Sequence, residues 1–265
     1  MSILKKSFSM ISGFTTARNV VKLKYPLEEC VRSLRAVCDE VVVNYDPYTD
    51  DGTHELVIKL ASELDLVLFE SKWDMNNKNL GTEIGIQADL TVEKCKNGWT
   101  LYCQLDEAVH EGDRRALGDL VRSAGAVTGF SFVRPYFWKN LHTIRKDWSI
   151  EIIRLTKKGT HTYSTMDGHN SKTLKGHVNR SGMWMYHYSR LGDPQAISQR
   201  IREIAVFFHE EDTLIPRDQL PDYDWGTRKW DNYSKIEIPP EVEAEFAVYK
   251  GTHPAPFAEL YGGLS

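Results

Sequence analysis

Apolar and polar positions in the first hundred residues follow two spacings, one typical of amphipathic helices and one typical of buried strands. Apolar residues recur at helical spacing in Pro26–Val37, where Pro stands at a favoured first-turn position. Between the helical segments lie short apolar or β-branched runs such as Val41–Val43, which are typical of buried strands. The predicted helices are Pro26–Val37, His54–Leu64 and Thr82–Lys94, and the predicted strands are Phe8–Gly13, Val41–Val43, Leu66–Phe69 and Trp99–Leu105. Strands that alternate with crossover helices predict an α/β fold, with a mostly parallel central sheet covered by helices.

The pattern loosens after Glu107. Phe130–Phe137 and Ser149–Thr156 are strand candidates, and the second could run antiparallel. Thr160–Lys175 is polar and contains a glycine, which predicts a loop or a lid. Pro194–Glu211 is the clearest helix of this half, with Asp193 as its expected N-cap. We expect one continuous globular unit, with an α/β half over residues 1–125 and a second half over residues 126–265.

Composition narrows the class of protein. The chain has 265 residues, of which 41% are hydrophobic, and its 33 basic and 37 acidic residues give a net charge of −4. These values exclude a disordered or fibrous chain, and the mild acidity argues against nucleic acid as a partner. No apolar run is long enough for a membrane span, and the first ten residues lack the apolar core of a signal peptide. The four cysteines form no CxxC pair, so we expect buried thiols and a reducing, cytoplasmic compartment.

The sharpest local feature is a pair of adjacent carboxylates, Asp106 and Glu107, at the end of the predicted strand Trp99–Leu105. Buried charge is costly unless it is paired or bound to a metal. A hard divalent cation takes oxygen ligands and can bridge the phosphates of a nucleotide, which predicts a metal–diphosphate site. The first turn of a helix would also favour two acidic residues, so the two carboxylates by themselves leave both interpretations open.

Several segments, in collinear order, resemble a GT-A-type, family-two-like glycosyltransferase. The matching segments are Ser12–Asn19, Asp39–Asp51, Gly81–Ala88, Trp99–Glu107, Trp148–Leu155, Tyr186–Arg190 and Gly251–Pro254. The resemblance implies a GT-A-like Rossmannoid fold with a C-terminal acceptor-side extension. It also implies a nucleotide-diphosphate sugar as donor, a glycan or other hydroxyl compound as acceptor, inversion at the anomeric carbon, and Mn²⁺ or Mg²⁺ as cofactor.

The resemblance and the strand-end positions together predict the site residues. For the nucleotide sugar they are Thr15, Arg18, Asp46, Asp50, Gly81, Gln104, Asp106 and Arg190, and for the metal they are Asp106, Glu107 and His187. For the catalytic base Glu151 is the first candidate, with Asp147 and Asp167 in reserve. Gln104 stands where the family often has the first Asp of its Asp-x-Asp motif, so the metal prediction rests on Asp106.

Other interpretations of the same residues remain open. His187 between two tyrosines could be a hydrogen-bonded core histidine, and Glu151 could form an ion pair with Arg154 or Arg145. A non-catalytic module that binds nucleotide sugars or carbohydrate is the alternative function on the same scaffold. A Rossmann dehydrogenase is disfavoured, because the first strand is followed by no GxGxxG segment.

Overall fold

The computed structural model describes residues 10–77, 79–164, 168–209, 211–225 and 245–264. The helices are α1 (Leu27–Val37), α2 (Thr53–Leu64), α3 (Thr82–Lys94), α4 (Arg114–Ser123), α5 (Pro194–Ala205) and α6 (Ala255–Tyr261). The strands are β1 (Ile11–Ala17), β2 (Glu40–Tyr45), β3 (Val67–Glu70), β4 (Trp99–Tyr102), β5 (Glu107–Ala108), β6 (Val127–Trp138), β7 (Thr143–Lys157), β8 (His161–Thr162), β9 (Lys172–Thr173), β10 (His177–Trp184), β11 (Tyr186–Arg190) and β12 (Phe246–Val248). None of the described helices combines the length and apolar character needed to cross a bilayer.

One large sheet organises these elements, in the order β3-β2-β1-β4-β7-β6-β11-β5. The strands of the first half, β3, β2, β1 and β4, pair in parallel, as the sequence predicts. β7 then pairs antiparallel with both β4 and β6, which joins the two halves of the chain in one sheet. The predicted α/β fold with a large central sheet is confirmed, whereas the division at residue 125 stays a prediction.

Helices cover both faces of the parallel part of the sheet. On one face, a Cβ atom added to Gly13 of β1 would lie 2.9 Å from the Cys38 sulfur and 3.0 Å from Leu34 of α1, so only glycine allows this close approach. On the other face, Phe14 stacks on Tyr102 at 4.7 Å between ring centroids and shares a core cluster with Ala88 of α3. Successive strand residues point to opposite faces, which explains why this strand is buried throughout.

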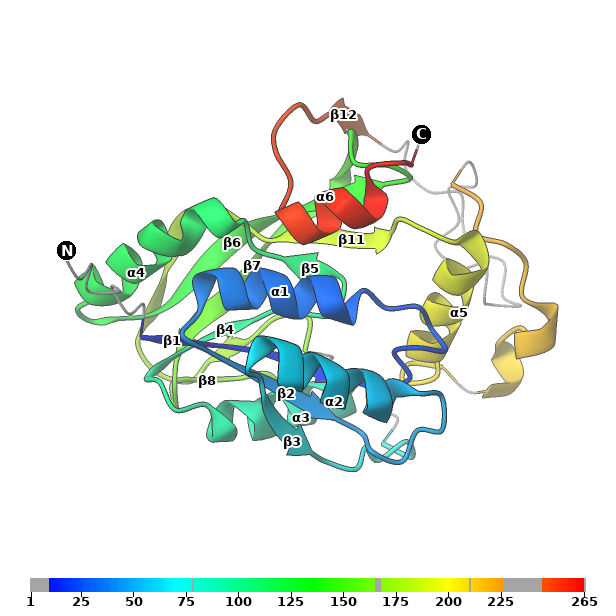
Figure 1. Ribbon diagram of the computed structural model, residues 1–265, viewed down its shortest axis with the longest axis horizontal. Helices are drawn as coiled ribbons and strands as arrows, with labels where there is room; N and C mark the ends of the chain where they lie inside the picture. The colour runs from blue at the N-terminus through cyan, green and yellow to red at the C-terminus, as the bar shows by residue number, and fades with distance from the viewer. Residues whose placement is uncertain (1–9, 78, 165–167, 210, 226–244, 265) are drawn as a thin grey trace.

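Several elements differ from the prediction. β1 extends to Ala17 rather than ending at Gly13, which places Thr15 and Thr16 inside the strand. β6 and β7 form a long antiparallel pair of 12 and 15 residues. α5 ends at Ala205, before the predicted Glu211, and stands at the end of the sheet toward which β11 points (Figure 1). The end of α5 and the carboxyl ends of β1 and β4 thereby enclose the candidate site.

Candidate active site

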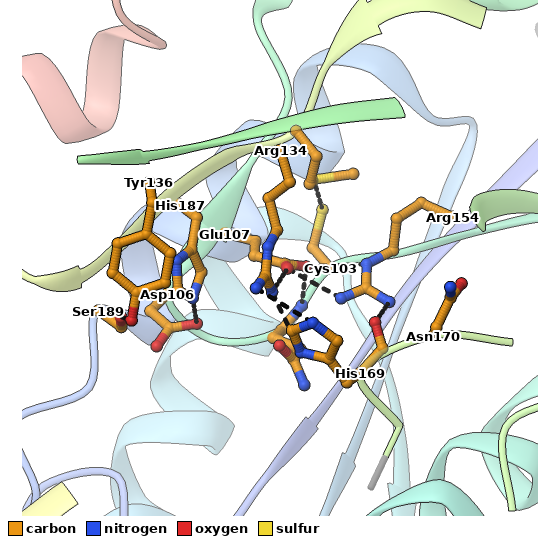
Figure 2. Close-up of polar contacts among 12 residues, drawn as sticks. Cys103, Asp106, Glu107, Arg134, Tyr136, Arg154, His169, Asn170, His187 and Ser189 are labelled. Atoms are coloured by element: carbon orange, nitrogen blue, oxygen red, sulfur yellow. Dashed lines mark hydrogen bonds and ion pairs between the residues drawn. The ribbon is translucent and has the colours of Figure 1, made fainter. Parts of the chain in front are cut away.

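A tight turn after β4 carries the two adjacent carboxylates. The Glu107 backbone N–H donates to the Gln104 carbonyl at 2.9 Å, and the Gln104 N–H donates to the Glu107 carboxylate at 3.0 Å. The Cys30 thiol on α1 also donates to the Gln104 carbonyl. Figure 2 shows the result: the two side chains turn apart, Asp106 toward His187 and Glu107 toward two arginines. Neighbouring residues of the same charge therefore sit in different environments.

Glu107 is a buried ion-pair residue. Arg154 donates to both carboxylate oxygens, at 3.0 and 2.8 Å, and Arg134 donates to one of them at 3.1 Å. Although burial alone would raise its pKa, the two guanidiniums lower the pKa of Glu107 to about 2. Arg154 also holds the following loop, through the His169 carbonyl at 2.8 Å. Arginines bind both carboxylate oxygens of Glu107. Of the three predicted metal ligands, Glu107 is therefore the one that the geometry supports least.

Asp106 and His187 form the second environment. The His187 Nε2 atom lies 3.6 Å from an Asp106 carboxylate oxygen, and both side chains are largely buried. Burial, and then the positive charge of Arg134, keep the pKa of His187 well below its ordinary value, so the imidazole is neutral. Burial and the neighbouring Glu107 charge raise the pKa of Asp106.

A carboxylate oxygen and a neutral imidazole nitrogen at this separation fit two ligands of one divalent cation, and this donor set suits Mn²⁺. The described residues contain no group of three or more His, Cys, Asp or Glu side chains arranged to hold a metal. Water or substrate oxygens would therefore complete the coordination of a cation held by Asp106 and His187.

The pocket beside Asp106 brings several predicted residues together. It is lined by Arg18 and Gln104, and the Arg18 Nε atom donates to the buried Asp46 carboxylate at 3.1 Å. Asp50 lies on an adjoining polar depression, which Arg18 also lines. Gly81 has a left-handed φ of 73° and is the N-cap residue of α3, and it is not among the residues that line these pockets.

The structure places Thr16, and not the predicted Thr15, at the pocket. Thr16 lines the pocket, whereas Thr15 shares the strand face of Gly13 and is fully buried under α1. The Thr15 hydroxyl has no hydrogen-bond partner among the described residues. The longer β1 accounts for this difference, because moving one position along a strand moves a side chain to the other face.

Two arginines line a second pocket next to Asp106. Arg190, which was predicted to bind the nucleotide sugar, lines a second pocket that shares Asp106 with the first, and its guanidinium lies 5.8 Å from the Tyr136 ring centroid. Arg200 of α5 lines the same pocket and was not predicted. The sequence held a signal for it, since Arg200 lies at helical spacing among Ile197, Ile201 and Ile204, and a charge on an apolar stripe requires a partner.

Glu151, the first candidate for the base, lies apart from these pockets. Glu151 accepts a hydrogen bond from Ser131 and pairs with the exposed Arg180, rather than with Arg154 or Arg145. Glu151 is not among the residues that line the two pockets at Asp106, so the structure does not bring it to the candidate site.

The two reserve candidates differ in what can be said of them. Asp147 pairs with Arg145 at 3.1 Å, and this guanidinium stacks on Trp148 at 3.6 Å from the ring centroid. Asp167 lies outside the described residues.

Comparison with known proteins adds a structural likeness. No family model and no curated protein matches the chain. Among solved structures, it is similar to a fragment of S. aureus TarS in complex with UDP-GlcNAc, with 15% identity, a TM-score of 0.42, and coverage of 74% of this chain and 66% of that one. It is also similar to a Pyrobaculum calidifontis mannosyltransferase in complex with GDP-Man and Mn²⁺ (19% identity, TM-score 0.35, 47% of this chain and 35% of that one).

A third similar structure is glucosyl-3-phosphoglycerate synthase from Mycobacterium tuberculosis in complex with Mn²⁺ and UDP (12% identity, TM-score 0.34, 47% of this chain and 43% of that one). The matched region spans two thirds or less of each of these proteins. The solved structures to which the chain is similar thus include nucleotide-sugar glycosyltransferases, the class that its sequence motifs resemble.

Proposed function

We propose that the chain is a glycosyltransferase that moves a sugar from a nucleotide-diphosphate sugar to an acceptor hydroxyl, with inversion. The observation that carries the proposal is the position of Asp106, at the junction of two pockets and 3.6 Å from a neutral histidine. Parallel sheets bind ligands beyond the carboxyl ends of their strands, and Asp106 lies beyond the end of β4. The four cysteines, all free and buried, support a reducing cytoplasmic location.

Different residues would bind the nucleoside, the diphosphate and the cation of the donor complex. Asp46 and Arg18 are placed to contact the nucleoside, since an ionised carboxylate accepts hydrogen bonds from a base N–H or a ribose diol. Arg190 is placed to bind phosphate oxygens of the leaving diphosphate. Asp106 and His187 would hold Mn²⁺ or Mg²⁺, which when bound supplies positive charge against that diphosphate.

For the base we propose Asp147, with Glu151 as the second candidate. A path of close contacts connects Asp147 to the site: its partner Arg145 stacks on Trp148, Trp148 contacts Tyr136 at 5.0 Å, and Tyr136 contacts His187 at 4.4 Å. The Asp147 carboxylate pairs with the Arg145 guanidinium at 3.1 Å, and a carboxylate is the kind of group that would take the acceptor proton.

The test is transfer from UDP-, GDP- and dTDP-sugars by wild-type protein and by Asp106→Asn, with Mn²⁺ or with EDTA. We expect turnover with the cation and at least about a hundredfold loss in the variant, since one electrostatic contact to a transition state is worth roughly that much. Asp119→Asn, which removes an exposed carboxylate on α4, is the matched control and should keep full turnover. Unchanged turnover in Asp106→Asn would contradict the proposal.

A non-catalytic nucleotide-sugar-binding module is the second candidate function. It is favoured by one observation: neither Glu151 nor Asp147 lines the two pockets that meet at Asp106. Donor binding that raises the melting temperature, without transfer or hydrolysis over a broad panel of acceptors, would support the module.

A further inference from the structure

Most of the lining of the second pocket beside Asp106 is apolar. The cavity has a volume of about 480 Å³, and its apolar side chains are those of Tyr25, Leu80, Ile201, Ile204, Ala205 and Phe208. Of these, Leu80 is 65% exposed and Ile204 is 40% exposed. Water therefore contacts two large aliphatic side chains here, and a ligand that covered them would gain the free energy of apolar burial.

Several polar groups of this lining are engaged within the protein. The Ser189 hydroxyl forms a hydrogen bond with a tyrosine hydroxyl at 2.6 Å and accepts another from Arg190 at 3.2 Å. Two nitrogens of Arg200 donate to backbone carbonyls, and its third, Nη1, has almost no accessible surface. The other polar residues of the described lining are Asp106 and His209, and Asp106 and Arg190 are the residues proposed for the cation and the diphosphate. An acceptor in this cavity therefore meets mainly carbon atoms.

Leu80 is held in the pocket wall by an unfavourable backbone conformation. The backbone N–H and the hydroxyl of Thr82 both donate to the Asn79 carbonyl, at 2.9 and 2.7 Å, which closes a turn around Leu80 and Gly81. Both central residues have a left-handed φ, 49° for Leu80 and 73° for Gly81. Glycine and asparagine adopt this conformation readily, whereas leucine does so at a cost in free energy. Because Leu80 is mostly exposed, packing among the described residues does not explain this cost, and contact with a ligand does.

Resting on the proposed function, we propose that the acceptor carries an apolar group beside its reacting hydroxyl, and that Leu80 and Phe208 bind this group. The cavity shares Asp106 with the first pocket, which Arg18 lines, and continues from there along α5. An acceptor hydroxyl that approaches the donor at Asp106 thus has its carbon skeleton against Leu80 and α5. The acceptor class is an alcohol or glycoside with an alkyl or aromatic group, because the hydroxyls of a free sugar would lose hydrogen bonds to water at this wall.

The test measures binding of ethanol and hexan-1-ol by ligand-observed NMR, to the protein alone and to the protein saturated with Mg²⁺ and either UDP or GDP. We expect hexan-1-ol to bind at least about tenfold more tightly than ethanol, since each buried methylene is worth about fourfold in affinity. Leu80→Asn suits the left-handed backbone, so it should keep the melting temperature and the nucleotide affinity of wild type. It should weaken hexan-1-ol binding by about fivefold, because the lost contact equals at least one buried methylene. Leu174→Asn, which replaces a similarly exposed leucine that lines neither pocket at Asp106, is the matched control and should bind hexan-1-ol as wild type does.

Three results would overturn the proposal: equal affinity for ethanol and hexan-1-ol, equal hexan-1-ol binding by wild type and Leu80→Asn, or competition between hexan-1-ol and the nucleotide. A change of oligomeric state in Leu80→Asn, measured by light scattering, would overturn it as well, because a second copy of the chain would then cover the wall. Benzyl alcohol separates the two kinds of apolar group, since tighter binding than that of hexan-1-ol would assign the cavity to an aromatic ring. Absence of nucleotide binding would refute the proposed function, whereas hexan-1-ol binding to the protein alone would still report on the apolar wall.

Discussion

Replacing Glu107 by Gln tests the strongest electrostatic interaction beside the site. The substitution keeps the size of the side chain but removes the charge that compensates Arg154 and Arg134, which are 0% and 3% exposed. Removing one member of a buried ion pair costs about 3–5 kcal/mol, because the remaining charge stays buried without compensation. The pKa gives a similar figure, since lowering it from 4.5 to about 2 corresponds to about 3 kcal/mol at 1.36 kcal/mol per unit.

The lowered pKa of Glu107 also determines how folding stability depends on pH. Because the folded pKa of Glu107 lies below the unfolded value of 4.5, the unfolded chain binds more protons between these values, and stability rises with pH there. The contribution of Glu107 is complete above about pH 4.5 and is lost as the pH falls toward 2. The stability difference between wild type and Glu107→Gln should therefore shrink over this interval.

Urea unfolding followed by tryptophan fluorescence, with EDTA present to exclude cations, measures both effects. With a slope of about 3 kcal/mol per molar urea, Glu107→Gln should unfold at roughly 1 M less urea than wild type at pH 7. Glu151→Gln is the matched control, since its carboxylate pairs with Arg180 at the surface and its midpoint should not move. A midpoint of Glu107→Gln equal to wild type, or a difference that stays constant from pH 7 to 3, would refute the reasoning.

Three further variants test the fold and the site. Asp106→Asn should unfold at a urea concentration no lower than wild type, because burial and the Glu107 charge already disfavour the ionised carboxylate; a clear loss of stability would contradict this. His187→Gln should weaken Mn²⁺ binding, measured by calorimetry with UDP or GDP present, by roughly tenfold, and equal affinity would remove this residue from the cation site. Gly13→Ala should lower the melting temperature, by overpacking of about 1–3 kcal/mol against Cys38 and Leu34, and an unchanged value would show that α1 can shift.

The parallel half of the fold was predictable because its signals are local. The helices over His54–Leu64 and Thr82–Lys94 were placed to within a residue at each end. The antiparallel pair β6 and β7 was seen only in part, since its length comes from pairing across the sheet rather than from a spacing within either strand. The end of β1 was missed for a similar reason: Thr15 and Thr16 look like loop residues, but pairing with β2 and burial keep them in the strand.

The site was harder to predict because its contacts join distant parts of the chain. Arg18 and Asp46, 28 residues apart, were predicted at neighbouring strand ends, and the structure pairs them. Arg134 and Arg154 lie 27 and 47 residues beyond Glu107, and nothing in their local sequence marks them as its partners. Sequence motifs therefore indicated which strand ends matter, but not which charge each carboxylate faces.

The adjacent carboxylates show why that difference matters for function. The tight turn after β4 directs the side chains of Asp106 and Glu107 apart, so that they reach different partners. Here Glu107 points inward and binds the two arginines, which fixes the turn that presents Asp106 and also carries β7 and β6 to the edge of the site. The inward carboxylate thus holds β6 and β7 against the turn that follows β4. If so, loss of Glu107 should disturb Asp106 and His187 together, whereas loss of Asp106 should leave the Glu107 ion pairs intact.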